Sequence, residues 1–286
     1  MAKMKNIQVS ALNIAMQTPH SAERYIELFE VVRRQRVLVK VDSLRAAMVG
    51  PISNHDDSQE YGPIYGEIYY FIKISRDEPW FNLITRAPAS LSDASSIELP
   101  THLLPHLKII PFVFGPTNHR LYFSSKISNA SLSTQRAKKI FEEIINSACR
   151  EGNFPQVNIT IIPDQETLEN IFNIHRLRTL EITLSPPNPD DSEDDQVRLL
   201  RKLDLMHAKK ETRTFHAKYG ESLSPDEETR TMALVAAENG KVVGEGIDEN
   251  GAKVKESTEG HPWMKNLRYD PDRQTAFGAM IASFFG

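Results

Sequence analysis

Cysteine is nearly missing from this sequence of 286 residues, which contains only Cys149. A single cysteine excludes an internal disulfide and a zinc site with several thiolate ligands, and it is typical of a reducing compartment. Long apolar runs are also missing, because no stretch reaches the roughly 18 residues that a membrane-spanning helix needs. Nothing near Met1 resembles a targeting signal. We therefore expect a cytoplasmic protein with no membrane partner.

The sequence also lacks a strong excess of charge of either sign. It has 34 Lys and Arg residues against 38 Asp and Glu residues, for a formal net charge of -4. A weakly negative protein attracts phosphate only through a local basic surface. Hydrophobic residues make up 40% and charged residues 25%, which is typical of folded proteins and excludes disordered and collagen-like chains. The length fits one large domain or two of ordinary size.

The familiar catalytic motifs are absent. Gly244-Glu245-Gly246 lacks the third glycine of a dinucleotide fingerprint and precedes a predicted hairpin rather than a helix. His102 and His106 have the spacing of zinc-binding histidines, but Pro105 lies between them and no glutamate follows His102. Neither a Walker-type loop nor a Gly-x-Ser-x-Gly turn occurs. We predict no cofactor, metal or catalytic residue, and the sequence favours a non-enzymatic role without deciding it.

Two acidic groups have alternative interpretations. Asp164 and Glu181 resemble the paired carboxylates with which metal-dependent nucleases hold Mg²⁺, but Thr183 stands where such nucleases need a lysine. Asp164 is better explained as a helix cap. In the acidic run 190–195, Ser192 with Asp195 resembles a capping box, whereas the carboxylates could also hold a cation. Consecutive carboxylates cannot all converge on one ion, so we favour capping there too.

Apolar periodicity predicts an α+β protein. Alternating apolar residues predict strands over 7–11, 37–41, 64–74, 109–114, 120–127, 157–161, 180–184, 242–247 and 252–256. Helical spacing behind capping residues predicts helices over about 21–35, from Ser131 or Ser133 to Gly152, after Asp164, from Pro225 to Asn239, and near the C-terminus. Loops are expected over 75–103 and 261–272. Residues 211–219 fit either a helix or a strand.

These elements predict mixed, largely antiparallel sheets with helices packed on one face. The run Ser185-Pro186-Pro187-Asn188-Pro189 must leave the sheet, because proline lacks a ladder N–H group, and the composition changes there. We expect two sub-domains: an N-terminal α+β domain over 1–186, and a C-terminal helix and hairpin region with a basic stretch over 187–286. Cys149 follows an apolar helix face and is interpreted as a small packing residue.

A basic stretch carries the hypothesis of nucleic-acid binding. Its cations are interleaved with Phe215, His216 and Tyr219, and aromatic rings can stack on bases while cations neutralise phosphate. The competing interpretation is an ordinary solvated helix face with ion pairs along it. The residues predicted to contact phosphate are Arg176, Arg178, Arg198, Arg201, Lys202, Lys209, Lys210, Arg213 and Lys218.

A group of aromatic residues lies before and within the long loop. Tyr65, Tyr69 and Phe71 occupy the strand face opposite a row of isoleucines, and Trp80 and Phe81 follow in the loop. They fit a stacking platform, a partner surface or a second core layer. No cations flank them closely, so we favour a core layer or a protein interface.

Short motifs along the whole chain carry a family resemblance. They are PHSAERY at 19–25, GEIYYF at 66–71, PWFN at 79–82, HRL at 119–121, PNPDD at 187–191, PDEETR at 225–230, AENG at 237–240 and YDPD at 269–272. With these motifs the sequence resembles the bacterial family called domain of unknown function family 4747, which supplies no catalytic residues to carry over.

More distantly, the order of elements after residue 177 is similar to that of the lambda exclusion protein Rex A. Both have a strand with polar flanks, a basic stretch, a hairpin with an Asp-Glu-x-Gly turn and a C-terminal helix. This likeness implies a DNA-binding sensor, working as a homodimer, in bacterial defence against phage.

Three hypotheses about function follow. The first is a cytoplasmic component of a phage-defence system, a sensor or effector that contacts the phosphates of DNA without reading its sequence. The second is a protein-interaction subunit whose apolar strand face and Trp80 loop dock a partner effector or a phage protein. The third is a divergent Mg²⁺-dependent nuclease that uses Asp164 and Glu181.

Overall fold

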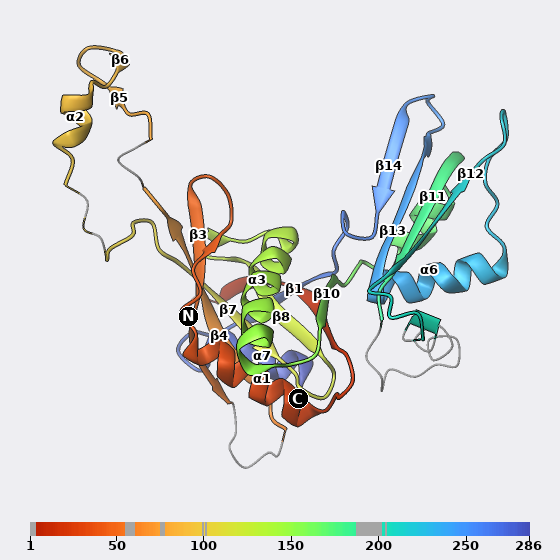
Figure 1. Cartoon of the computed structure of the whole chain (residues 1–286), viewed down its shortest axis with the longest axis horizontal. Coiled ribbons are helices and arrows are strands. Elements are labelled where there is room, and N and C mark those ends of the chain that lie inside the picture. Colours follow the sequence, from red (N-terminus) through yellow and green to blue (C-terminus); the bar gives the residue numbers. More distant parts are fainter. Residues whose placement is uncertain are drawn as a thin grey trace.

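A computed structural model of the chain describes residues 4–54, 61–74, 78–98, 100, 102–186, 202–203 and 205–286. It has an α+β fold, as the sequence predicts, with three parts that are visible in Figure 1. A large sheet with helices forms the main body, a smaller sheet with its own helices lies beside it, and a long arm extends away from both. Among the described helices, none combines the length and the apolar character needed to cross a bilayer.

The main body is built around a nine-stranded antiparallel sheet. Its strands follow the order β10-β1-β8-β7-β4-β3-β2, with β15 also paired to β1 and β9 also paired to β8. The bounds are β1 Lys5–Met16, β2 Val39–Lys40, β3 Arg45–Asn54, β4 Ile64–Ile72, β7 Lys108–Phe114, β8 Arg120–Ile127, β9 Ala130–Ser131, β10 Val157–Ile161 and β15 Met264–Tyr269.

Helices cover both faces of this sheet. α1 (Ala22–Arg34) and α3 (Thr134–Gly152) share a core with Phe112 and Phe114 of β7. α7 (Ala276–Phe284) shares a second core with Val113 of the same strand. Since neighbouring residues of a strand point to opposite faces, α7 lies across the sheet from α1 and α3. The sequence predicts helices on one face, and the structure adds this helix on the other.

The smaller sheet is inserted between two strands that share one edge of β1. β10 pairs with residues 12–16 of β1, and β15 pairs with residues 5–10. The chain leaves the body after β10 and rejoins it where the N–H of Trp263 donates to the carbonyl oxygen of Ile162 at 2.8 Å. The sheets therefore divide the chain near residues 162 and 263, and not at the predicted boundary after residue 186.

The inserted unit is a four-stranded antiparallel sheet with helices on one face. Its strands follow the order β12-β11-β13-β14, and α4 and α6 pack over a core that includes Leu180, Ile182 and Val242. We call the opposite side of this sheet the open face. The bounds are α4 Thr167–Phe172, β11 Arg176–Leu184, β12 Glu211–His216, α6 Glu227–Asn239, β13 Gly240–Ile247 and β14 Lys253–Ser257.

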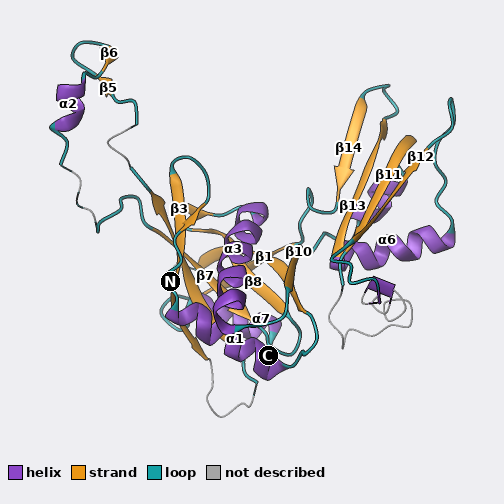
Figure 2. Cartoon of the chain, in the orientation of Figure 1, coloured by secondary structure: helices purple, strands orange, loops and turns teal. Residues whose placement is uncertain are grey.

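The arm connects β4 to β7, which are neighbours in the large sheet. It contains β5 (Phe81–Asn82) and β6 (Ala87–Pro88), which pair with each other as a separate two-stranded sheet, and the short helix α2 (Leu91–Ser95). Figure 2 shows the arm as mostly loop, held away from the two larger sheets.

Capping and periodicity predicted many of these elements. Ser21 and Ser133 are the N-caps of α1 and α3, and each hydroxyl accepts the N–H of the residue three positions later. α6 lies within the predicted range, with Asp226 as its N-cap. The predicted hairpins β7–β8 and β13–β14 are also confirmed. Residues 211–216, which fitted either a helix or a strand, form β12.

Three expectations about elements are wrong. Residues 264–269 form β15 and not a loop, because β1 offers them a free edge. Asp164 does not cap α4, because the N-cap of this helix is Glu166. Asp164 Oδ1 instead accepts the N–H of Glu166 at 3.1 Å in the preceding turn. β10, α4 and β11 do not build one sheet, because β10 and β11 belong to different sheets. The acidic run at 190–195 lies outside the described residues.

Candidate functional site

Two of the predicted phosphate-binding residues bind the carboxylate of Glu211 instead. Lys202 Nζ donates to both oxygens of Glu211 at 2.9 Å, and Arg213 Nε donates to Glu211 Oε1 at 2.9 Å. The hydrogen bond from Lys202, with that from Arg213, holds the pKa of Glu211 below its usual value against the effect of partial burial. The two cations share one carboxylate, so the cluster keeps one net positive charge while both side chains are held by Glu211.

The basic residues are also divided between the two faces of the small sheet. Arg213 pairs with Ile182 on the helix-covered face, whereas Arg176 pairs with Ile247 on the open face. Arg178 Nη1 donates to the carbonyl oxygen of Glu221 at 2.6 Å. Exposed side chains are found at Arg176, Lys209, Lys210 and Lys218, and Arg198 and Arg201 lie outside the described residues.

The open face carries mostly polar side chains, with Val243 buried among them. Cross-strand hydrogen bonds link Thr183 Oγ1 to Thr212 Oγ1 at 3.1 Å, and Lys255 Nζ to Glu245 Oε1 at 2.6 Å. Glu245 raises the pKa of Lys255 through this bond. On the open face, basic residues outnumber acidic residues. The charged residues on this face are Arg176, Lys241, Lys253 and Lys255 against Glu181 and Glu245.

The tip of the arm presents large apolar side chains to solvent. Phe81, Leu83, Ile84 and Leu91 are 62%, 83%, 92% and 92% exposed. Their backbone is held in a defined turn, because Asn82 Oδ1 accepts the N–H groups of Ile84 and Thr85 at 2.9 and 3.1 Å. We call these four apolar residues the arm tip. By contrast, Tyr65 packs on Phe277 of α7, with ring centroids 5.0 Å apart, so this part of the aromatic group is a core layer.

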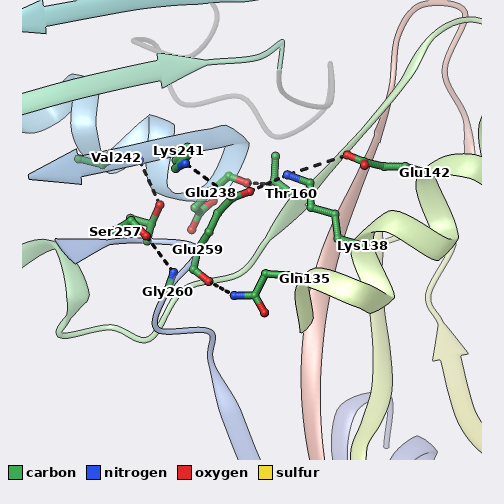
Figure 3. Close-up of polar contacts among 11 residues, drawn as sticks. Gln135, Lys138, Glu142, Thr160, Glu238, Lys241, Val242, Ser257, Glu259 and Gly260 are labelled. Atoms are coloured by element: carbon green, nitrogen blue, oxygen red, sulfur yellow. Dashed lines mark hydrogen bonds and ion pairs between the residues drawn. The ribbon is translucent and has the colours of Figure 1, made fainter. Parts of the chain in front are cut away.

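Glu259 ties the inserted unit to the main body (Figure 3). Its carboxylate accepts from Lys138 Nζ of α3 at 2.6 Å and lies 3.5 Å from Lys241 Nζ of β13. Its carbonyl oxygen accepts from Gln135 Nε2 at 2.7 Å. Burial would raise the pKa of Glu259, but the two ammonium groups hold it below its usual value. Burial raises the pKa of the neighbouring Glu142, against the ammonium groups of Lys138 and Lys209.

The C-terminal end of α6 is fixed to the large sheet nearby. Thr160 Oγ1 donates to the carbonyl oxygen of Glu238 at 2.6 Å, and Asn13 Nδ2 donates to Asn239 Oδ1 at 3.1 Å. These bonds satisfy groups at a helix end that would otherwise lack partners.

A cleft of about 480 Å³ lies beside this junction, where the chain leaves and rejoins the main body. One wall is aromatic: Tyr122 and Trp263 meet edge to face with ring centroids 6.1 Å apart, and Tyr122 is stacked on Phe284 at 4.1 Å. Burial raises the pKa of Tyr122. The lining residues are Ala11, Arg120, Tyr122, Ile162, Pro163, Asp164, Gln165, Leu168, Leu234, Ala237, Glu238 and Trp263.

The cleft also contains three charged side chains. Arg120 Nη2 lies 3.7 Å from Glu238 Oε2, which is an ion pair but too long for a hydrogen bond. Asp164, in the segment before α4, also lines the cleft. Glu181, its predicted nuclease partner, lies on the open face of β11 instead. Within the described part of the chain, no three His, Cys, Asp or Glu residues are grouped so that they could hold a metal ion.

Sequence reasoning did not find this cleft as a site. Its charged and aromatic residues come from β8, the segment before α4, α6 and the segment before β15. No fixed spacing connects them, so only the fold brings them together. Trp263 is the one local signal, because a tryptophan in a predicted loop needs a place to pack.

The comparison with known proteins gives one family. The family model described as Domain of unknown function (DUF4747) matches residues 5–283. No curated protein matches the chain.

Proposed function

We propose that this chain, which belongs to the DUF4747 family, is a protein-interaction subunit that docks a partner protein through its arm tip. The observation that carries the proposal is the exposure of Phe81, Leu83, Ile84 and Leu91 on one projecting element. A contiguous apolar patch exposed on a folded protein marks an interaction site, and we propose that these four side chains form such a patch. Burying one such side chain at an interface contributes about 1.5–3 kcal/mol.

The charge of the arm indicates what the partner surface is like. Among the described residues 78–98, the arm carries Glu78, Asp93 and Glu98 against one cation, Arg86. An apolar groove with a basic rim is complementary to such a tip. We place this docking in bacterial phage defence because of the similarity in layout to Rex A, with the partner being a defence effector or a phage protein.

Photo-crosslinking in the protein's native cells tests this proposal. A photoreactive amino acid at Leu83 is expected to capture one specific protein, and the same group at Glu249 on the β13–β14 turn serves as the matched exposed control. With that partner purified, Ile84→Asp should weaken binding at least about 100-fold, as expected for an apolar hot spot.

Two results would contradict the docking proposal. One is the same set of captured proteins at Leu83 and Glu249, which would indicate random collision. The other is a purified partner that binds Ile84→Asp as tightly as the unmodified chain. A crosslink between two copies of this chain would identify the arm as a dimer contact, in line with the expected homodimer, and would replace the proposal of a different partner.

A second candidate function is binding of DNA without sequence preference, in the same defence setting. The observation that favours it is the open face, whose Thr and Lys side chains offer hydroxyl and ammonium donors on one side of the sheet. Phosphate oxygens accept hydrogen bonds from such donors without reading the bases. The pairing of Lys202 and Arg213 with Glu211 leaves the open face as the better interface.

Matched double variants test the DNA-binding candidate. Arg176→Ala with Lys253→Ala removes two cations from the open face, and Lys202→Ala with Arg213→Ala removes two that already bind Glu211. DNA affinity should fall only in the first pair, and the slope of log affinity against log salt should drop by about 0.9 per lost phosphate contact. A flat salt response in the unmodified chain, or equal losses in both pairs, would rule this interface out.

A further inference from the structure

The cleft between β8 and α6 has the composition of a small-molecule site. Its lining is mainly apolar and aromatic, with a few polar groups at the margin, and its 480 Å³ lie within the range of sites for small ligands. Leu234 of α6 lines it and is 60% exposed. An exposed leucine and two aromatic rings that line the same cleft offer apolar surface to the body of a ligand.

The charges of the cleft favour a cation. The lining carries one cation, Arg120, and two carboxylates, Asp164 and Glu238, so its net charge is negative. Asp164 Oδ1 accepts a backbone N–H, and among the described residues no cation is paired with this carboxylate. The rings of Trp263 and Tyr122, both half-buried in the cleft wall, can add cation–π attraction.

The end of α6 acts in the same direction. Leu234, Ala237 and Glu238 belong to the last turns of this 13-residue helix and line the cleft. The C-terminal end of a helix carries a partial negative charge, which favours a nearby cation. The apolar wall, the excess carboxylate and the helix end thus select for the same ligand chemistry.

We propose that this cleft binds a small organic cation, an amine or guanidinium group carried on an aromatic or apolar body. The body lies between Leu234 and the Trp263 ring, and the cationic group lies at the margin near Asp164 and Glu238. This site is separate from the arm tip and from the open face, so it does not depend on either proposed function.

Three probes that share one phenylethyl body test the proposal: 2-phenylethylamine, the neutral 2-phenylethanol and the anionic 3-phenylpropionate. The chain has two tryptophans, so Trp80→Phe leaves Trp263 as the single fluorescent reporter at the cleft. We expect saturable quenching by the amine, with calorimetry on the unmodified chain giving the same affinity. The amine should bind about fivefold more tightly than the alcohol, and the acid more weakly than both, as solvent-exposed ion pairs allow.

Charge variants separate a binding role from a structural one. Asp164→Asn should lower the affinity for the amine about three- to fivefold. Glu249→Gln, which makes the same charge change on the exposed β13–β14 turn, should leave this affinity unchanged. Asp164→Asn with Glu238→Gln leaves Arg120 as the only charge in the cleft, so the preference should reverse toward 3-phenylpropionate. A loss of folding alone cannot produce this reversal.

Three outcomes would overturn the proposal. The first is equal binding of the alcohol and the amine, which would make the cleft an apolar pocket only. The second is a double variant that keeps its preference for the amine. The third is that no probe shows saturable binding up to about 10 mM, because a specific site of this size should have a lower dissociation constant.

Discussion

Among single residues, Glu259 connects two elements, α3 and β13, through one side chain. It receives a hydrogen bond from Lys138 and an ion pair from Lys241, and its side chain is only 23% exposed. A carboxylate that is mostly shielded from water and has two cationic partners is costly to neutralise, because both ammonium groups lose their partner. The link between the inserted unit and the main body therefore depends on the charge of Glu259.

Glu259→Gln is expected to lower the free energy of unfolding by about 1–2 kcal/mol at pH 7. The pKa of Glu259 in the folded chain is below its usual value, so its contribution is complete above the unfolded pKa of about 4.3 and is lost as the pH falls through the folded pKa. Urea unfolding at pH 7 and below pH 4 should show the difference between wild type and variant shrinking in acid. Glu249→Gln provides the control, and a difference that grows in acid would contradict the assignment.

Cys149 illustrates how burial changes the chemistry of a side chain. It lies near the end of α3, partly buried against the main core, and burial raises its pKa to about 11. The thiolate is the reactive form, so the folded chain should react with a disulfide reagent at pH 8 about 100-fold more slowly than the urea-unfolded chain. Equal rates in the two states would mean that the thiol is accessible.

At the level of elements, the sequence predicted those whose signals are local. α1 and α3 combine a serine cap with apolar residues at helical spacing, and both signals lie within one short stretch of chain. The hairpin β13–β14 is predicted by Asn250-Gly251 alone, where Gly251 has a φ of 83° that glycine adopts without strain. Such elements need no information from the rest of the fold.

The elements that the sequence missed owe their structure to distant partners. In β15 only Leu267 and Tyr269 are at least partly buried, so the segment has too few apolar residues to predict a strand. It forms a strand because it pairs with β1. Ser10 is a polar residue of β1, yet it is fully buried, and α3 supplies Thr134 as its hydrogen-bond partner at 3.0 Å. Neither contact leaves a signal within ten residues of the element.

Gly240 shows how one position controls the pairing of two elements. A Cβ atom there would lie 1.9 Å from the carbonyl oxygen of Thr183, so β13 can approach β11 at this point only with glycine. Gly240→Ala should therefore cost about 2–4 kcal/mol of stability. Gly278→Ala in α7 is the control: its Cβ would have ordinary contacts, and the helix should gain up to about 1 kcal/mol. Chemical denaturation of both variants measures the difference, and equal stabilities would show that β11 shifts without cost.

On the scale of the whole molecule, the order of parts could not be read from the sequence. The proline run at 185–189 marks a change in composition, but the chain leaves the main body earlier, after β10, and returns at β15. The exit and the return meet on one edge of β1, and the cleft lies beside that meeting point. Residues of β1 and α6, together with Trp263, line the cleft. They form a site only when both sheets are in place.

The arm gives the last prediction at this scale. β5 and β6 pair only with each other, and Tyr70 of β4 pairs directly with Lys108 of β7. Joining Lys73 to Pro105 through Asn-Gly, in place of residues 74–104, should leave the main body folded, because a tight turn can close this antiparallel pair. The shorter connection should add about 1–2 kcal/mol to the stability by lowering the entropy of loop closure.

Thermal and urea unfolding of the shortened chain measure this change. Leu83→Ser with Ile84→Ser in the full-length chain is the control: it keeps the arm, should leave the stability unchanged, and should reduce self-association by removing exposed apolar surface. If the shortened chain instead loses more than about 2 kcal/mol, a cost on the scale of burying a large side chain, the arm tip packs against the body in solution. In that case the same four side chains would be core residues, and the surface that we assign to a partner protein would already be covered by the chain itself.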